Sequence, residues 1–182
     1  MSGHFTVHPL YRADGEGAGL ATDALMAAGQ TVFQVFQMAD NEPEHCQWLL
    51  QCADRDRTIQ RVLSLGCGVG GMEAHWHLLR PELEFELVNI SQAQLDRCLC
   101  KGEKVKANAE DYHSKREPFD MVVIAYLLGH VDVHKTLASA LANLAPWGTM
   151  LIYDVFEGTS SFRETLLYDT PQLRDKIGRA HV

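Results

Sequence analysis

The stretch Leu63-Ser64-Leu65-Gly66-Cys67-Gly68-Val69-Gly70-Gly71 joins a short apolar segment to a glycine-rich loop. A buried strand followed by glycines and then by a helix lets the backbone turn tightly and approach a ligand above the strand ends. Gly66, Gly68 and Gly71 match the dinucleotide pattern G-x-G-x-x-G, whereas Gly66, Gly68 and Gly70 match a G-x-G-x-G loop. The loop therefore predicts a nucleotide-like ligand of undetermined type, and a ligand-free structural turn is the alternative.

Short apolar segments alternate with helical patterns from residue 61 onward. The expected strands are 62–65, 85–90, 105–107, 121–125 and 150–155, and the expected helices are 72–80, 91–101 and 132–144. This alternation is typical of a parallel sheet wrapped by helices. The predicted fold is a Rossmann-like, doubly wound α/β domain with a mostly parallel sheet.

The chain before this pattern reads as helical. Asn41 has the features of an N-cap, with Glu44 three residues beyond it, which predicts a helix over 42–53. We expect residues 1–60 to form an N-terminal helical cap and residues 61–182 to form the core of the same domain.

Composition limits the classes of protein that the chain can represent. With 182 residues, 46% of them apolar and 22% charged, it is expected to form one globular domain. The formal net charge of −8 disfavours nucleic acid and anionic membrane surfaces as partners. Five cysteines are an odd number, and the first residues have no signal-peptide pattern. We expect a cytoplasmic protein with reduced thiols, and the sequence leaves a homodimer open.

Five blocks of sequence occur in a characteristic order: RVLSLGCGVGG, ELVNISQAQLDRC, VKANAED, EPFDMVVIAYLLGHV and LANLAPWGTMLIYDV. Together they cover residues 61–155 and resemble the successive motifs of class I S-adenosylmethionine-dependent methyltransferases. The resemblance implies S-adenosylmethionine as cofactor, S-adenosylhomocysteine as product, and an O, N or C nucleophile of a small molecule as methyl acceptor. Ser91 and Gln94, in a block similar to the cyclopropane-fatty-acid-synthase-like branch, also form a capping box.

The resemblance assigns residues by position. The cofactor-binding residues that it implies are Ser64, Gly66, Cys67, Gly68, Gly70, Asn89, Ile90, Gln94, Asn108, Ala109 and Ala125. The ribose hydroxyls would meet Asn89, and the adenine would meet Ile90, Asn108 and Ala109. The candidates for catalysis are His130 and Tyr126, and Tyr153 is a further candidate for substrate contact, because they lie near the carboxyl ends of the fourth and fifth expected strands, where such folds bind ligands. No metal is expected, because the spacings of His75-x-His77 and Cys98-x-Cys100 do not match common zinc sites.

The chain departs from the family pattern in two ways. Neutral residues, Ser64, Asn89 and Asn108, stand where the family usually has acids, and an amide binds ribose hydroxyls less strongly than a carboxylate. The tail after Val155 reads as one or two helices around Pro171, so the usual C-terminal strand pair is expected to be shortened or missing.

These departures leave two alternatives to a methyltransferase. The first is a catalytically degenerate relative that binds the cofactor or a partner. The second is an NAD-dependent oxidoreductase, which is disfavoured because Asn89 replaces the acid expected at the adenine ribose.

Overall fold

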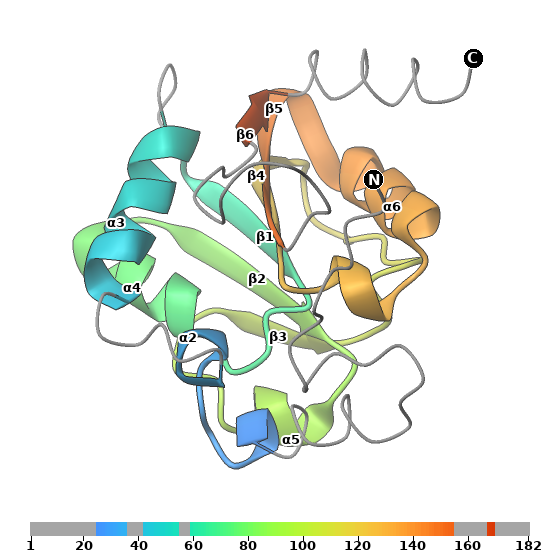
Figure 1. Cartoon of the computed structure of the whole chain (residues 1–182). Coiled ribbons are helices and arrows are strands. Elements are labelled where there is room, and N and C mark those ends of the chain that lie inside the picture. The colour runs from blue at the N-terminus through green and yellow to red at the C-terminus, as the bar shows by residue number, and fades with distance from the viewer. Residues whose placement is uncertain (1–24, 36–41, 55–58, 155–166, 170–182) are drawn as a thin grey trace, which may run out of the picture.

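The computed structural model describes residues 25–35, 42–54, 59–154 and 167–169. Within these residues the chain forms a six-stranded sheet (Figure 1). The strands are β1 (Arg61–Leu65), β2 (Glu84–Asn89), β3 (Glu103–Lys106), β4 (Phe119–Ala125), β5 (Leu144–Tyr153) and β6 (Leu167–Asp169). Their order is β3-β2-β1-β4-β5-β6, with β1 to β5 parallel and β6 antiparallel to β5. The predicted doubly wound α/β fold is confirmed.

Helices cover both faces of this sheet. They are α2 (Val32–Val35), α3 (Glu42–Ala53), α4 (Gly71–Leu79), α5 (Gln92–Leu95), the 3₁₀ turn η3 (Leu128–His130) and α6 (Val133–Asn143). In Figure 1, α3 and α4 lie on one side of the sheet and α6 lies on the other. Described helices lack the length and apolar character that a membrane crossing requires.

Two apolar cores follow from the alternation of side chains along the strands. Val62 of β1 and Phe85 of β2 point to the core under α3 and α4, which also contains Trp76 of α4. Leu63 of β1 points to the other face, where Ala140 of α6 completes the second core. Because both faces of the sheet centre are covered, the central strands β1 and β4 consist mostly of buried apolar residues, as expected for parallel strands, whereas β3 is largely exposed.

Several predicted elements are confirmed, and others are corrected. Helix α3 matches the prediction over 42–53, while its predicted cap, Asn41, lies outside the described residues. The predicted helix 91–101 is wrong after Leu95, because the chain there turns back under the glycine loop. There Leu99 N–H donates to Val69 O (2.8 Å). Tertiary contact with the loop thus replaces the remaining helical turns.

The C-terminal part of the sheet differs from the prediction in two places. Strand β5 begins at Leu144, not at residue 150, because Leu144 already pairs with Phe119 before a bulge. Residues 167–169 form β6, where the sequence predicted helix. Pro171 lies outside the described residues, and the division into a cap and a core stays a prediction.

Candidate functional site

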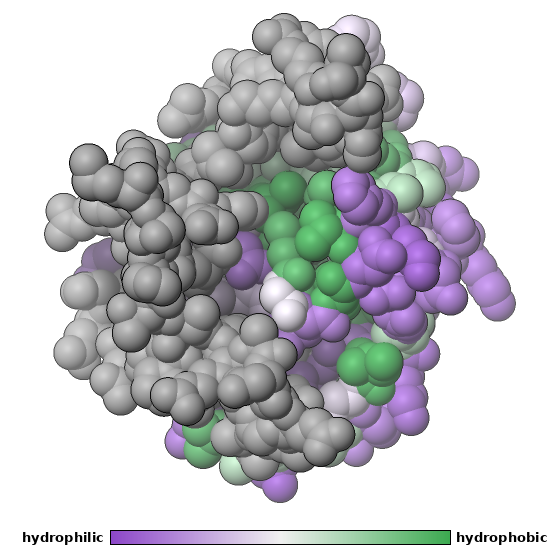
Figure 2. All heavy atoms as spheres, turned by 45° about the vertical axis from the view of Figure 1, so that its right-hand side comes forward, coloured by the Kyte–Doolittle hydropathy of each residue, from purple (hydrophilic) through white to green (hydrophobic). Residues whose placement is uncertain are grey.

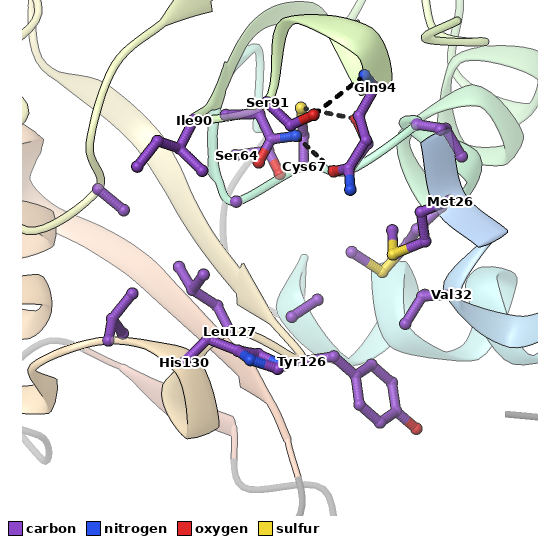
Figure 3. A pocket seen from close by; sticks show the side chains of 18 of the residues that line it. Met26, Val32, Ser64, Cys67, Ile90, Ser91, Gln94, Tyr126, Leu127 and His130 are labelled. Carbon is purple, nitrogen blue, oxygen red and sulfur yellow. Dashed lines mark hydrogen bonds between the residues drawn. The ribbon is translucent and has the colours of Figure 1, made fainter. Parts of the chain in front are cut away.

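A cavity of about 410 Å³ lies at the carboxyl ends of β1, β2 and β4. This volume falls within the range of small-molecule sites, roughly 300–1,000 Å³. Every predicted cofactor-binding residue except Gly70 lines it, and so do Tyr126 and His130. Figure 3 shows Ser91 and Gln94 on one side of the cavity, with Tyr126 and His130 on the opposite side. The topology therefore gathers residues from separate sequence blocks, and their roles stay predictions.

The glycine loop forms one wall of the cavity in a backbone conformation that favours glycine. Gly66, Gly68 and Gly70 have φ angles of 74°, 58° and 64°. The amides of Gly66 and Cys67 both donate to Val88 O, at 2.8 and 3.1 Å, and Gly70 N–H donates to Cys67 O at 2.9 Å. The loop is thus held by its own backbone and by β2.

Gly68 and Gly70 face different surroundings. A Cβ on Gly68 would come within 2.2 Å of Met26 Cε, which also lines the cavity. A Cβ on Gly70 would come within 2.5 Å of Cys98 Sγ, which does not line it. Gly70 therefore accommodates the chain packed beneath the loop, while Gly68 keeps the cavity open.

A buried amide pair joins the end of β2 to α5. Asn89 Nδ2 donates to Gln94 Oε1 at 2.6 Å, and both side chains are buried. One of the two hydrogen bonds of the predicted capping box is confirmed, because Gln94 N–H donates to Ser91 Oγ at 3.4 Å. Ile90, next to this pair, is 68% exposed at the cavity. The site thus presents a polar amide beside an exposed apolar side chain.

The side of the cavity after β4 carries aromatic and titratable groups. Tyr126 has a φ of 50°, which is unusual outside glycine. Its hydroxyl donates to the Tyr153 hydroxyl at 3.4 Å, and burial raises the pKa of Tyr153. Tyr153 does not line this cavity, and its substrate contact stays a prediction. His130 of η3 is exposed, and η3 is held by Asp154, whose Oδ2 accepts from Leu128 N–H at 2.7 Å.

Sequence reasoning missed Glu73, in the first turn of α4. Its carboxylate is 2% exposed and lines the cavity, and Ser64 Oγ donates to Glu73 Oε1 at 2.6 Å. Burial raises the pKa of the Glu73 carboxyl, and the Ser64 hydrogen bond opposes that rise. A charged residue between the apolar Met72 and Ala74 at a helix start was the available signal. Met26 and Val32 also line the cavity, and nothing in their local sequence indicates it.

The described residues contain no group of three or more His, Cys, Asp or Glu side chains that could hold a metal ion. The described cysteines are free thiols. The polar side chains that line the cavity are amides, hydroxyls, one thiol, one histidine and two carboxylates, of which Glu73 is the buried one.

Comparison with known proteins identifies the family to which the chain belongs. A family model described as "Methyltransferase domain" matches residues 38–177. No curated protein sequence matches the chain.

Solved structures share the fold at low sequence identity. The plantazolicin methyltransferase BpumL, with a desmethyl plantazolicin analogue and S-adenosylhomocysteine, is 17% identical, with 77% of this chain and 54% of that chain covered and a TM-score of 0.57. The N-methyltransferase NodS from Bradyrhizobium japonicum is 17% identical, with 72% and 70% covered and a TM-score of 0.55. An amino pentose methyltransferase from Micromonospora echinaspora is 17% identical, with 75% and 56% covered and a TM-score of 0.54. The chain thus spans little more than half of the first and third of these proteins.

Proposed function

The chain belongs to the methyltransferase domain family, and on this premise we propose that it transfers the methyl group of S-adenosylmethionine to a small-molecule acceptor. One observation carries the proposal: the cavity at the strand ends opens directly onto Gly68, where any side chain would reduce the space. A loop of this kind lets a ligand lie against the backbone.

The residues around the cavity fit the parts of this cofactor. The exposed side chain of Ile90 and the small Ala109 offer apolar surface to a flat base. Asn89 offers a buried amide to the ribose hydroxyls. Gly66 and Gly68 leave room for the methionine part. The neutral Asn89 predicts a weaker ribose contact than a carboxylate would make, by about 1 kcal/mol.

The cofactor supplies an activated methyl group, so the protein has mainly to bind, orient and exclude water. Tyr126 and His130 lie across the cavity from Gln94 (Figure 3). We place the acceptor on the side of Tyr126 and His130. The imidazole of His130 can accept a proton from an acceptor hydroxyl or amine as it is methylated. Tyr126 is held by its bond to Tyr153 and would position the acceptor.

A small-molecule acceptor is supported by the surface and by the neighbours. Figure 2 shows apolar side chains gathered in the centre of the face that is turned forward, beside hydrophilic ones. The net charge of −8 disfavours a phosphate backbone. The names of the solved structures include a plantazolicin and an amino pentose methyltransferase. Free thiols among the described residues agree with a cytoplasmic protein, which we retain as part of the proposal.

Thermal denaturation and calorimetry with S-adenosylmethionine, S-adenosylhomocysteine and NAD test the proposal. A ligand present at about 100 times its Kd adds about 2.7 kcal/mol of stability and raises Tm by roughly 5–11 °C in a domain of this size. We expect this rise with the first two compounds and none with NAD. A rise with NAD alone would overturn the proposal. Binding without turnover across a panel of acceptors would favour a degenerate relative, which the neutral Ser64, Asn89 and Asn108 motivate.

A further inference from the structure

Glu73 places a buried carboxylate against the cavity, from the first turn of α4. The side chain is 2% exposed, and its Oε1 accepts a hydrogen bond from Ser64 Oγ at 2.6 Å. Its second polar contact is with its own backbone N–H. Both contacts are with neutral groups.

No ion pair within the described ranges includes Glu73. Four thiols, those of Cys46, Cys67, Cys98 and Cys100, lie close enough to Glu73 to be affected by its charge. A thiol cannot neutralise a carboxylate. A buried carboxylate without a counter-charge is unfavourable, and proteins keep such groups only where a cation or a proton compensates them. Glu73 lines the cavity, so a cationic group of a ligand placed there would compensate its charge.

The place of Glu73 beside Ser64 strengthens this argument. Ser64 stands in β1 at a position where the family that the chain resembles usually has an acid. Here the charge is absent from β1, but the hydroxyl of Ser64 binds a carboxylate that reaches the same point from α4. The start of a helix also favours a negative charge through its dipole.

We propose that Glu73 is the anionic partner of the positively charged part of S-adenosylmethionine, so that the charge missing at Ser64 is supplied from α4. This inference rests on the proposed function. The cofactor carries two cationic groups, the ammonium of the methionine part and the sulfonium. Either group would place a cation opposite the carboxylate. Ligands that carry one, both or neither of these groups show which of them Glu73 contacts.

The experiment measures Kd by calorimetry for wild type and Glu73→Gln, a substitution that keeps the size and hydrogen bonding of the side chain. We expect Glu73→Gln to raise the Kd for S-adenosylmethionine by at least about tenfold, which is the effect of losing a hydrogen bond to a charged group. Equal weakening of S-adenosylhomocysteine identifies the ammonium, and weakening of S-adenosylmethionine alone identifies the sulfonium. 5′-Methylthioadenosine has neither cation and should bind both proteins equally.

Glu42→Gln is the matched control. Glu42 is a second buried carboxylate, 6% exposed in α3, where Thr31 Oγ1 donates to its Oε2 at 3.2 Å. It does not line the cavity, so its substitution should leave every Kd unchanged. The Tm of each ligand-free protein shows whether a change in Kd comes from lost binding or from a destabilised fold. Because burial raises the pKa of Glu73, its ionised form destabilises the fold at neutral pH, and Glu73→Gln should melt no lower than wild type there.

A double variant that moves the carboxylate from residue 73 to residue 64 makes the test independent of how Glu73→Gln folds. In Ser64→Asp/Glu73→Gln the carboxylate returns to β1, and the Kd for S-adenosylmethionine should lie within about threefold of wild type, less than 1 kcal/mol. The inference is overturned if Glu73→Gln keeps its affinity within twofold, if it weakens 5′-methylthioadenosine equally, or if the double variant binds that control ligand but not the cofactor. Failure of wild type to bind S-adenosylmethionine would instead overturn the proposed function.

Discussion

Alanine substitutions at two glycines of the loop should separate ligand binding from stability. Gly70→Ala places a residue at a φ of 64° and brings its Cβ within 2.5 Å of Cys98 Sγ and 3.4 Å of Cys100 N. The left-handed backbone costs about 1–2 kcal/mol, and overpacking adds about 1–3 kcal/mol. The free energy of unfolding should fall by roughly 2–5 kcal/mol, which lowers Tm by about 4–20 °C.

Gly68→Ala should lose less stability and more binding. Its φ of 58° carries a similar backbone cost, about 1–2 kcal/mol. The atom that its Cβ meets is the terminal Cε of Met26, at the flexible end of a side chain that can move away. We therefore expect Tm to fall by about 2–8 °C. The added methyl group and the displaced Met26 both occupy the cavity, so the cofactor should bind at least about tenfold more weakly.

Gly129→Ala is the control for both variants. A Cβ at Gly129 meets nothing within 4 Å, and its φ is not positive. Its Tm should stay within about 2 °C of wild type, since surface substitutions usually change stability by less than about 0.5 kcal/mol. Thermal melts followed by circular dichroism give the stabilities, and calorimetry below Tm gives each Kd. The reasoning is refuted if Gly70→Ala is as stable as Gly129→Ala, or if Gly68→Ala binds the cofactor like wild type.

Three further predictions concern single side chains. Asn89→Asp should hold or tighten cofactor affinity, by up to about tenfold, because Gln94 can turn its amide N–H toward the new carboxylate; a weaker Kd by calorimetry would contradict this. His130→Ala should lower turnover by about 100-fold and leave Tm and cofactor Kd unchanged, since the side chain is exposed; a lower Tm with unchanged turnover per folded molecule would make His130 structural. A hydrogen bond from Cys67 lowers the pKa of Cys98 to about 7, so its alkylation by iodoacetamide, followed by mass spectrometry, should reach half its maximal rate near that pH. Cys67→Ala should move this midpoint upward, and a wild-type midpoint near that of an ordinary thiol would refute the assignment.

Local signals explain which parts of the fold could be predicted. The parallel sheet follows from short apolar segments separated by helical patterns, because strands covered on both faces need apolar residues throughout. Helix starts were predictable where a side chain caps the backbone, as Ser91 does for α5 and Asp132 for α6. The capping signal sets where a helix begins and says nothing of where it ends.

Contacts between distant segments explain the errors. Helix α5 stops after one turn because Cys98 and Cys100 pack under Gly70, about thirty residues earlier in the chain. The early start of β5 depends on a pairing between Leu144 and Phe119. Glu73 escaped notice because its meaning depends on Ser64, and only the turn between β1 and α4 brings these two side chains together.

The internal hydrogen bonds of the glycine loop occupy three of its N–H groups, which a ligand therefore cannot use. Loops that hold pyrophosphate do so with backbone N–H groups directed at the anion. Here the N–H groups of Gly66, Cys67 and Gly70 are already engaged by carbonyl oxygens of the chain. Glu73 adds a negative charge next to the same loop, which would repel a phosphate. If the proposed function holds, these features would disfavour the phosphates of a dinucleotide, whereas S-adenosylmethionine carries no phosphate and would meet no such repulsion.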